Sequence, residues 1–123
     1  MVICDTDVFI EYLKGDSKTK KKLVQIGVKN IGLSVISVME LYYGAINKNE
    51  LNKIKKAIAS LNILNVNDKI SIKSMKLIES FSKSHGLKIP DALIAATTII
   101  ENTDLFTYNK KDYKFIREIK FHI

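Results

Sequence analysis

Four short apolar runs, separated by segments with helical periodicity, constrain the fold of this chain more than any other feature. The runs cover residues 2–5, 31–36, 63–66 and 105–108. Each has the length of a strand, whereas the intervening segments carry apolar residues at the three- and four-residue spacing of a helix face. Strands that alternate with helices form parallel sheets. We therefore expect an α/β fold, a three-layer α/β/α sandwich around a central parallel sheet of about 4–5 strands.

Capping signals set the expected helix ends. After the first run a short helix continues to about residue 13, and Asp16-Ser17 caps a basic helix that continues to about residue 28. Ser37 and Glu40 match a capping box that opens a helix to about residue 47. Further helices are expected at residues 50–60, from 68 or 71 to about 84, and from about Pro90 to 100, with a terminal edge strand at 119–123.

The length of 123 residues and the apolar content of 46% indicate one globular domain, residues 1–123. No apolar stretch approaches the roughly 20 residues that span a bilayer. Acids interrupt the start of the chain, where a signal peptide would be apolar. We expect a cytoplasmic protein with no membrane segment. The single Cys4 excludes an internal disulfide, and two distant histidines leave a zinc site without ligands.

The net charge of +7 comes from lysine, with 20 basic residues against 13 acidic ones. The lysines form two clusters, one of Lys18, Lys20, Lys21 and Lys22 and the other of Lys53, Lys55 and Lys56. Such clusters are typical of solvated helix faces in a lysine-rich chain, and equally of a surface that attracts phosphates. Charge alone does not choose between these interpretations.

Four acids stand where this fold would bring them together. Asp5 ends the first run and Asp112 follows the fourth, while Glu40 and Asp91 fall in the first turns of helices that begin at the same sheet edge. If the second and fourth strands flank the first, all four acids face one cleft. Crowded carboxylates repel unless a cation compensates them, and Mg²⁺ or Mn²⁺ prefers oxygen ligands. In a basic chain this combination indicates a metal-dependent nuclease.

Each acid also has a structural explanation. Asp5 and Asp7 would form a strand-to-helix turn in which Asp7 caps the helix, and Glu40 would bond back to the backbone in the capping box. Asp91 would complement the helix dipole, and Asp112 would be an ordinary loop acid. The functional interpretation therefore rests on the four acids together.

Four segments resemble the motifs of the PIN-domain ribonucleases, particularly the VapC-type toxins of bacterial and archaeal toxin–antitoxin pairs. The similarity covers almost the full chain, with all four segments in order. They are Asp5-Thr6-Asp7-Val8-Phe9-Ile10-Glu11-Tyr12-Leu13-Lys14-Gly15, Ser34-Val35-Ile36-Ser37-Val38-Met39-Glu40-Leu41-Tyr42-Tyr43-Gly44-Ala45, Asp91-Ala92-Leu93-Ile94-Ala95-Ala96 and Thr107-Tyr108-Asn109-Lys110-Lys111-Asp112-Tyr113. The resemblance implies a doubly wound α/β/α sandwich whose acidic site uses Mg²⁺ or Mn²⁺ to cleave RNA.

Carried over by position, the resemblance implies roles for five of these residues. Asp5 and Asp91 would be the principal metal ligands, and Glu40 would complete the site directly or through a bound water. Thr6 and Thr107 would be supporting hydroxyls that hold carboxylates or phosphate.

The fourth acid differs among the relatives. Some carry it at the position of Asn109, and others rely on the position of Asp112. Asn109 is neutral in this chain, so Asp112 takes the role and would hold a second metal.

The resemblance also implies partners. RNA would be the substrate, a cognate VapB-like antitoxin would lay a peptide segment across the toxin, and a second copy of the chain would complete a homodimer. Tyr42-Tyr43 and apolar positions of the first helices are candidate contact surfaces, and they fit a plain core equally well.

Other functions are compatible with parts of the sequence. The chain fits a PIN nuclease of RNA processing or repair, or a catalytically idle PIN module that binds RNA or a partner. A haloacid-dehalogenase-type phosphohydrolase is disfavoured because Phe9 stands where its motif has Thr or Val. A phosphoacceptor signalling domain is disfavoured because the order of the acids does not match.

Overall fold

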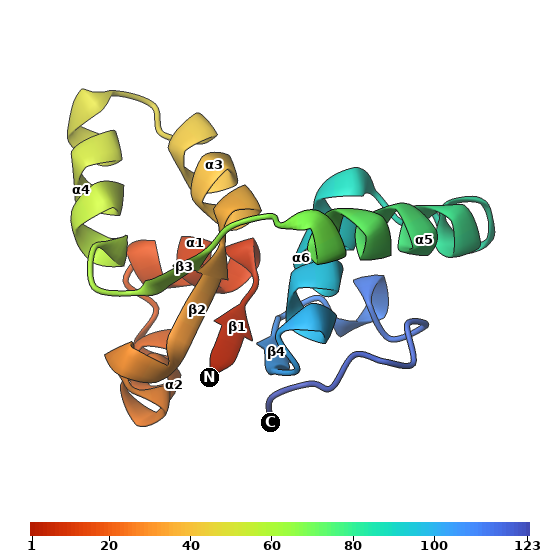
Figure 1. The fold of residues 1–123 in the computed structure, drawn as a ribbon. Helices are drawn as coiled ribbons and strands as arrows, with labels where there is room; N and C mark the ends of the chain where they lie inside the picture. The colour runs from red at the N-terminus through yellow and green to blue at the C-terminus, as the bar shows by residue number, and fades with distance from the viewer.

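A four-stranded, fully parallel sheet lies at the centre of the computed structural model, which describes residues 1–123 (Figure 1). The strands are β1 (Val2–Cys4), β2 (Ile31–Ser34), β3 (Asn62–Leu64) and β4 (Asp104–Phe106). Their order is β3-β2-β1-β4, so β1 lies between β2 and β4. The predicted parallel α/β fold is confirmed, together with the strand neighbours on which the convergence of the acids depends.

Six α-helices connect and cover the strands. They are α1 (Thr6–Leu13), α2 (Ser17–Ile26), α3 (Val35–Tyr43), α4 (Lys48–Ile58), α5 (Asp68–His85) and α6 (Ile89–Ile100), with 3₁₀ turns η1 (Val28–Asn30) and η2 (Lys110–Asp112). The helices α5 and α6 pack together on one side of the sheet, and α1, α2 and α4 lie on the other (Figure 1). No helix has the length and apolar character needed to cross a membrane.

Successive strand residues point to opposite sheet faces and supply two separate cores. Ile3 of β1 and Leu105 of β4 pack against α5 and α6. Cys4 and Phe106, one residue further along, pack against α1, α2, α3 and α4. All four side chains are at most 3% exposed. Because both faces are covered, the strands appear in the sequence as continuous apolar runs instead of alternating ones.

The junction of β2 and α3 differs from the sequence prediction. The predicted strand extends through residue 36, but β2 ends at Ser34, whose Oγ accepts a hydrogen bond from the Ile36 N–H at 3.1 Å. Ser34 therefore caps α3 in place of Ser37, which is buried inside the helix. The predicted capping box is wrong, and Glu40 lies in the second turn of α3 instead of the first.

Several other elements also begin or end a few residues from their predicted bounds. Helix α3 ends at Tyr43, not near residue 47, because Asn47 caps α4 by accepting the Glu50 N–H at 2.9 Å. Helix α2 ends at Ile26, since Gly27 adopts a φ of 88° that stops the helix. Strand β3 covers Asn62–Leu64, one residue before the predicted start and two short of the predicted end.

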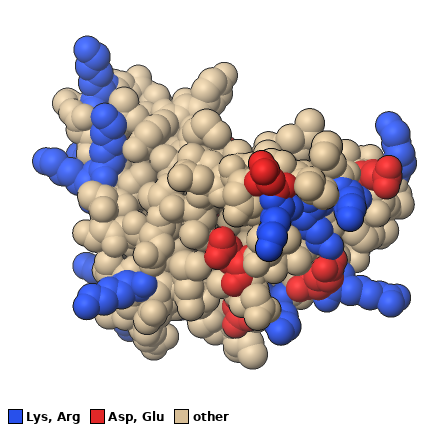
Figure 2. All heavy atoms as spheres, viewed as in Figure 1, with Lys and Arg blue, Asp and Glu red and all other residues tan.

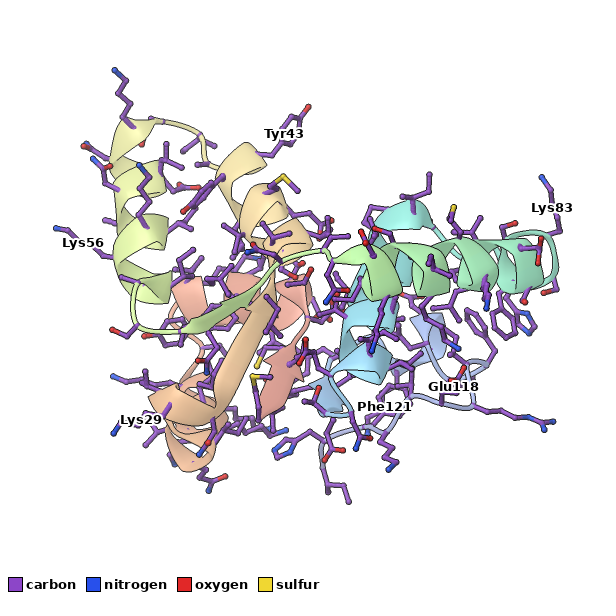
Figure 3. All side chains as sticks on the ribbon, viewed as in Figure 1. Lys29, Tyr43, Lys56, Lys83, Glu118 and Phe121 are labelled. Carbon is purple, nitrogen blue, oxygen red and sulfur yellow. The ribbon has the colours of Figure 1, made fainter.

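The predicted terminal strand at residues 119–123 is reduced to one parallel bridge between Leu105 and Phe121. Leu105 N–H donates to the Lys120 carbonyl, and His122 N–H donates to the Leu105 carbonyl, each at 2.8 Å. Phe121 lies close to β4 in the lower part of Figure 3. The end of the chain thus covers the β4 edge with two hydrogen bonds instead of a full strand.

Candidate active site

Asp5 occupies the centre of the site because it follows β1, which lies between β2 and β4. It is 7% exposed and is the N-cap of α1. Its Oδ1 accepts the Thr6 N–H at 2.8 Å, and its Oδ2 accepts the Thr107 hydroxyl at 2.8 Å. Burial raises the pKa of Asp5 and the charge of Glu40 raises it further, whereas these hydrogen bonds lower it. Asp5, not Asp7, is therefore the residue that caps the first helix.

Asp91 lies in the first turn of α6, as the sequence predicted. Its side chain is half-buried, and its Oδ1 accepts a hydrogen bond from the Tyr113 hydroxyl at 3.2 Å. Burial raises the pKa of Asp91 to about 6, with further contributions from the charges of Asp5, Asp112 and Glu40. These electrostatic effects show that carboxylates from four separate segments share one region of the molecule.

Glu40 reaches the site from α3 and is held by Thr6. The Thr6 hydroxyl donates to Glu40 Oε1 at 2.7 Å and lies 2.9 Å from the Ser37 Oγ. The hydroxyl of Thr6 therefore supports a carboxylate, as expected for it. Glu40 itself is exposed, so it borders the site from the solvent side.

The two candidates for the fourth acid have different surroundings. Asp112 is exposed in η2, and its charge raises the pKa of Asp91. Asn109 donates its side-chain N–H to Asp7 Oδ2 at 2.8 Å, and its backbone N–H donates to the Thr107 hydroxyl at 3.0 Å. The Asn109 amide thus orients a neighbouring acid, and Asp112 is the member of the pair that interacts electrostatically with Asp91.

Asp7 and Tyr113 belong to the site although no role at the site was predicted for them. Asp7 Oδ2 accepts the Tyr108 backbone N–H at 3.1 Å, whereas its buried Oδ1 has no hydrogen-bond partner. Burial raises the pKa of Asp7 to about 6, and the charge of Asp5 adds to the shift. Tyr113 is completely buried, and burial raises its pKa as well. The Asp5-x-Asp7 spacing was the only signal in the sequence for Asp7.

The chemistry of this donor set fits a hard divalent cation. The ligand atoms are carboxylate oxygens, whose pKa values are raised first by burial and further by the neighbouring negative charges. In the side-chain positions of this structure, no group of three or more His, Cys, Asp or Glu residues could hold a metal ion. Mg²⁺ commonly takes one or two carboxylates and completes its octahedron with waters and phosphate oxygens. The pair Asp5 and Asp91 is sufficient by that standard.

Known proteins resemble this chain over almost its full length. The family model described as PIN domain matches residues 2–118. Ribonuclease VapC1 of Methanocaldococcus jannaschii is 30% identical over 125 residues, which is 99% of this chain and 85% of that protein.

Solved structures of toxin–antitoxin complexes have the same fold. A toxin–antitoxin complex from Klebsiella pneumoniae contains a chain that is 28% identical, with a TM-score of 0.82 over 97% of this chain and 95% of that chain. VapBC2 from Rickettsia felis, bound to a DNA fragment from its promoter, contains a chain that is 25% identical, with a TM-score of 0.86 over 99% and 98% of the two chains.

Proposed function

This chain belongs to the PIN-domain family, and from that premise we propose that it is a metal-dependent endoribonuclease, the VapC-type toxin of a toxin–antitoxin pair. The proposal is carried by the carboxylates of Asp5, Glu40 and Asp91, which are held by the hydroxyls of Thr107, Thr6 and Tyr113 and couple electrostatically. Such coupling costs free energy unless a cation is bound, and a chain of net charge +7 suits a polyanionic substrate. Similarity to a ribonuclease and to toxin–antitoxin complexes supports the same activity.

In this proposal Asp5 and Asp91 would hold Mg²⁺ or Mn²⁺, Glu40 would complete the site directly or through water, and Asp112 would bind a second ion. An ion of this kind lowers the pKa of water and offsets the charge that develops on a scissile phosphate. Phosphodiester hydrolysis of RNA is the reaction that this combination performs.

The neighbouring hydroxyl groups orient the carboxylates. The Thr6 N–H and the Thr107 hydroxyl donate to the two oxygens of Asp5, and the Tyr113 hydroxyl donates to one oxygen of Asp91. Each carboxylate is therefore held in one orientation, and its oxygens keep further lone pairs for a ligand. Removing a hydrogen-bond partner that orients a metal ligand commonly lowers metal affinity or activity by about 10–100-fold.

Cleavage of labelled structured RNAs tests the proposal. We expect cuts that need Mg²⁺ or Mn²⁺, stop with chelator, and vanish in Asp5→Ala and Asp91→Asn variants that remain folded. Asp112→Ala should give a smaller loss that depends on metal concentration. Glu79→Gln, an exposed acid of α5, is the matched control and should cleave like the wild type.

Two results would contradict this assignment. Full activity in folded Asp5→Ala or Asp91→Asn protein would place the site elsewhere. If the wild-type chain neither cleaves RNA nor binds metal, an idle PIN module is the better description. Metal-dependent cleavage in a chain that no antitoxin inhibits would instead favour a PIN nuclease of RNA processing.

A groove beside Glu40 suits the antitoxin partner. It has a volume of about 580 Å³ and lies between α1, α3 and α4, with Ile10, Leu13 and Leu41 among its apolar lining residues. Glu40 is the one site carboxylate on its wall, so an antitoxin segment in the groove would place a basic side chain against the site. Ile10→Asp should abolish inhibition by a VapB-like antitoxin and leave RNA cleavage intact, whereas unchanged inhibition would exclude the groove.

An exposed apolar face on α5 and α6 suits the proposed homodimer. Met75 and Ile89 are 66% and 67% exposed beside a shallow groove between the two helices. Of the two tyrosines considered as contact surfaces, Tyr42 packs on the core. Tyr43 is 94% exposed at the end of α3 and points away from the protein (Figure 3). Met75→Glu should give a monomer in sedimentation velocity, whereas Val24→Glu on α2 should not, and a monomeric wild type would contradict the dimer.

A further inference from the structure

Tyr108 is an exposed aromatic side chain fixed at the border of the acidic site. It is 42% exposed, although Phe106 and Thr107 before it are 3% and 4% exposed. Its backbone N–H donates to Asp7 Oδ2 at 3.1 Å, and its ring packs edge-on against Phe106 with centroids 5.4 Å apart. The residue that follows the Asp5-binding Thr107 therefore presents a large flat ring to solvent.

The hydroxyl of Tyr108 is held by the start of α2. It lies 2.6 Å from the Thr19 Oγ1, which in turn lies 2.6 Å from Asp16 Oδ2. The carboxylate of Asp16 only accepts, so the single hydroxyl proton of Thr19 goes to Asp16, and Tyr108 donates to Thr19. This chain of hydrogen bonds fixes the orientation of the ring before any ligand arrives.

Positive charge lies next to the ring. The Lys22 Nζ is 5.4 Å from the Phe106 centroid and 5.8 Å from the Tyr108 centroid. Lys18, four residues earlier, lies on the same side of α2 because residues four apart are neighbours on a helix. Both lysines are exposed, and neither forms a salt bridge; the ion pairs of the chain involve Lys14 and Lys73.

We propose that Lys18, Lys22 and Tyr108, here called the α2–Tyr108 surface, bind a single-stranded stretch of RNA next to the scissile phosphate. The ring of Tyr108 stacks on a nucleobase, and the two lysines contact the backbone phosphates on that side. The inference rests on the proposed nuclease function and names the part of the chain that positions its substrate.

Charge and ring together favour single-stranded RNA over other polyanions. Lysines alone attract any phosphate backbone, but an exposed aromatic ring gains from bases only where they are unstacked, as in loops and single strands. A duplex would contact the lysines and leave the ring unused. The ring also lies at the carboxylate cluster, where a bound strand would reach the metal ligands.

Helix α4 provides the matched control for charge. Figure 2 shows lysine side chains projecting from the α4 edge of the molecule, and Figure 3 shows Lys56 pointing away from the protein there. Lys55 and Lys56 are exposed like the lysines of α2, but neither ammonium group lies over an aromatic ring. Removing two charges from α4 changes the net charge of the chain as much as removing two from α2.

Fluorescence anisotropy with a short labelled single-stranded RNA of mixed sequence tests the inference, in an Asp5→Asn background that prevents cleavage. Tyr108→Leu should weaken binding roughly ten-fold, and Tyr108→Phe, which keeps the ring, should bind within about two-fold of the wild type. The pair Lys18→Gln/Lys22→Gln should lower the salt dependence of binding by about one phosphate contact or more. Lys55→Gln/Lys56→Gln should leave that dependence unchanged, and thermal melting confirms that each variant is folded.

Four outcomes would overturn the inference. These are unchanged binding by folded Tyr108→Leu, an equal loss in Tyr108→Phe, equal effects of the α2 and α4 lysine pairs, and an equal loss on a duplex of the same sequence. Metal-dependent cleavage by the wild type together with any of these would reject the α2–Tyr108 surface and leave the proposed nuclease standing. A wild type that neither binds nor cleaves RNA would reject both.

Discussion

Thr107 connects the sheet to the chemistry of the site at the scale of single residues. It is buried at the end of β4, and its hydroxyl donates to Asp5 across a sequence separation of 102 residues. A hydrogen bond to a charged group contributes about 1.5–3 kcal/mol to the free energy of unfolding, and its loss costs that amount. The orientation of Asp5 therefore depends on a residue that contains no ionisable group.

Thr107→Val should weaken both the fold and the site. At neutral pH we expect the free energy of unfolding to fall by about 1.5–3 kcal/mol, because the Asp5 carboxylate loses its donor, and Mn²⁺ affinity to fall by about ten-fold or more. Urea denaturation and calorimetric titration of Mn²⁺ measure the two effects. Thr97→Val, at a buried threonine that donates to the Leu93 carbonyl, should leave Mn²⁺ affinity unchanged. Equal losses of affinity in both variants would contradict a specific role.

Tyr113 should influence the titration of Asp91. Its hydroxyl donates to Asp91 Oδ1 and lowers the pKa of that acid, against the larger effect of burial. In Tyr113→Phe the pKa of Asp91 should therefore rise, so that Mn²⁺ binding near pH 6 weakens more than binding near pH 8. A loss of the same size at both pH values would indicate a packing role alone.

Four acids could be proposed as site residues from the sequence because they follow strands or lie near the starts of helices, which are positions that local patterns reveal; the roles of Thr6 and Thr107 came from the family resemblance. Asp7 and Tyr113 could not be proposed in this way. The fit of Asp7 to a helix cap concealed its contact with Tyr108 and Asn109, whose backbone and amide groups arrive from 101 or more residues away. The hydrogen bond of Tyr113 depends on where η2 returns the chain to α6, which no local period encodes.

At the scale of elements, the start of α3 determines where Glu40 points. The helix begins one turn earlier than the capping pattern predicts, since Ser34 satisfies the Ile36 N–H directly at the end of β2. Ser37 is then turned inward beside Thr6, and Glu40 is free to accept the Thr6 hydroxyl. Two serines three residues apart fit the capping role equally well in sequence, and tertiary contacts select between them.

Ser34→Ala should destabilise the protein through the loss of this cap. Replacing an N-cap serine by alanine costs about 1 kcal/mol. We expect the free energy of unfolding to fall by that amount, seen as a lower urea midpoint with an unchanged slope. Asn47→Ala removes the cap of α4, a helix that contributes no predicted site residue, and serves as a comparison of similar size that leaves RNA cleavage normal. No change in stability for Ser34→Ala would show that α3 does not depend on this cap.

At the scale of the whole molecule, the parallel topology brings the acids together. Asp5 follows β1, a central strand, and Thr107 follows β4, the edge strand beside it in the order β3-β2-β1-β4. The alternation of apolar runs and helical segments was sufficient to predict this architecture, because each buried parallel strand is apolar on both faces. The last strand was overpredicted, since a five-residue tail with alternating apolar side chains makes one bridge only.

The burial and the mutual repulsion of these carboxylates should make the metal-free protein lose stability as pH rises. The pKa values of Asp7 and Asp91 are about 6 in the folded chain, above the unfolded value of 3.8. Between these values the folded chain binds more protons than the unfolded chain, so the free energy of unfolding falls as pH increases. The stabilising contribution is fully present below about pH 4 and is lost above about pH 6.

Thermal melting in chelator measures this dependence. The melting temperature should fall between about pH 4 and about pH 7, the fall should be smaller in Asp91→Asn, and Mg²⁺ should raise the melting temperature at neutral pH. Glu79→Gln should reproduce the wild-type curve. If Asp91→Asn shows the same dependence of melting temperature on pH as the wild type, ionisation of Asp91 does not destabilise the folded chain.

Calorimetric titration of Mn²⁺ into the wild-type chain and into Asp91→Asn at neutral pH tests the central claim most directly, because the claim is that the crowded carboxylates are a divalent-cation site. We predict saturable binding to the wild type, with release of protons from acids whose pKa values are raised, and little or no binding to Asp91→Asn. Equal binding to the two proteins, or none to a folded wild type, would contradict the account.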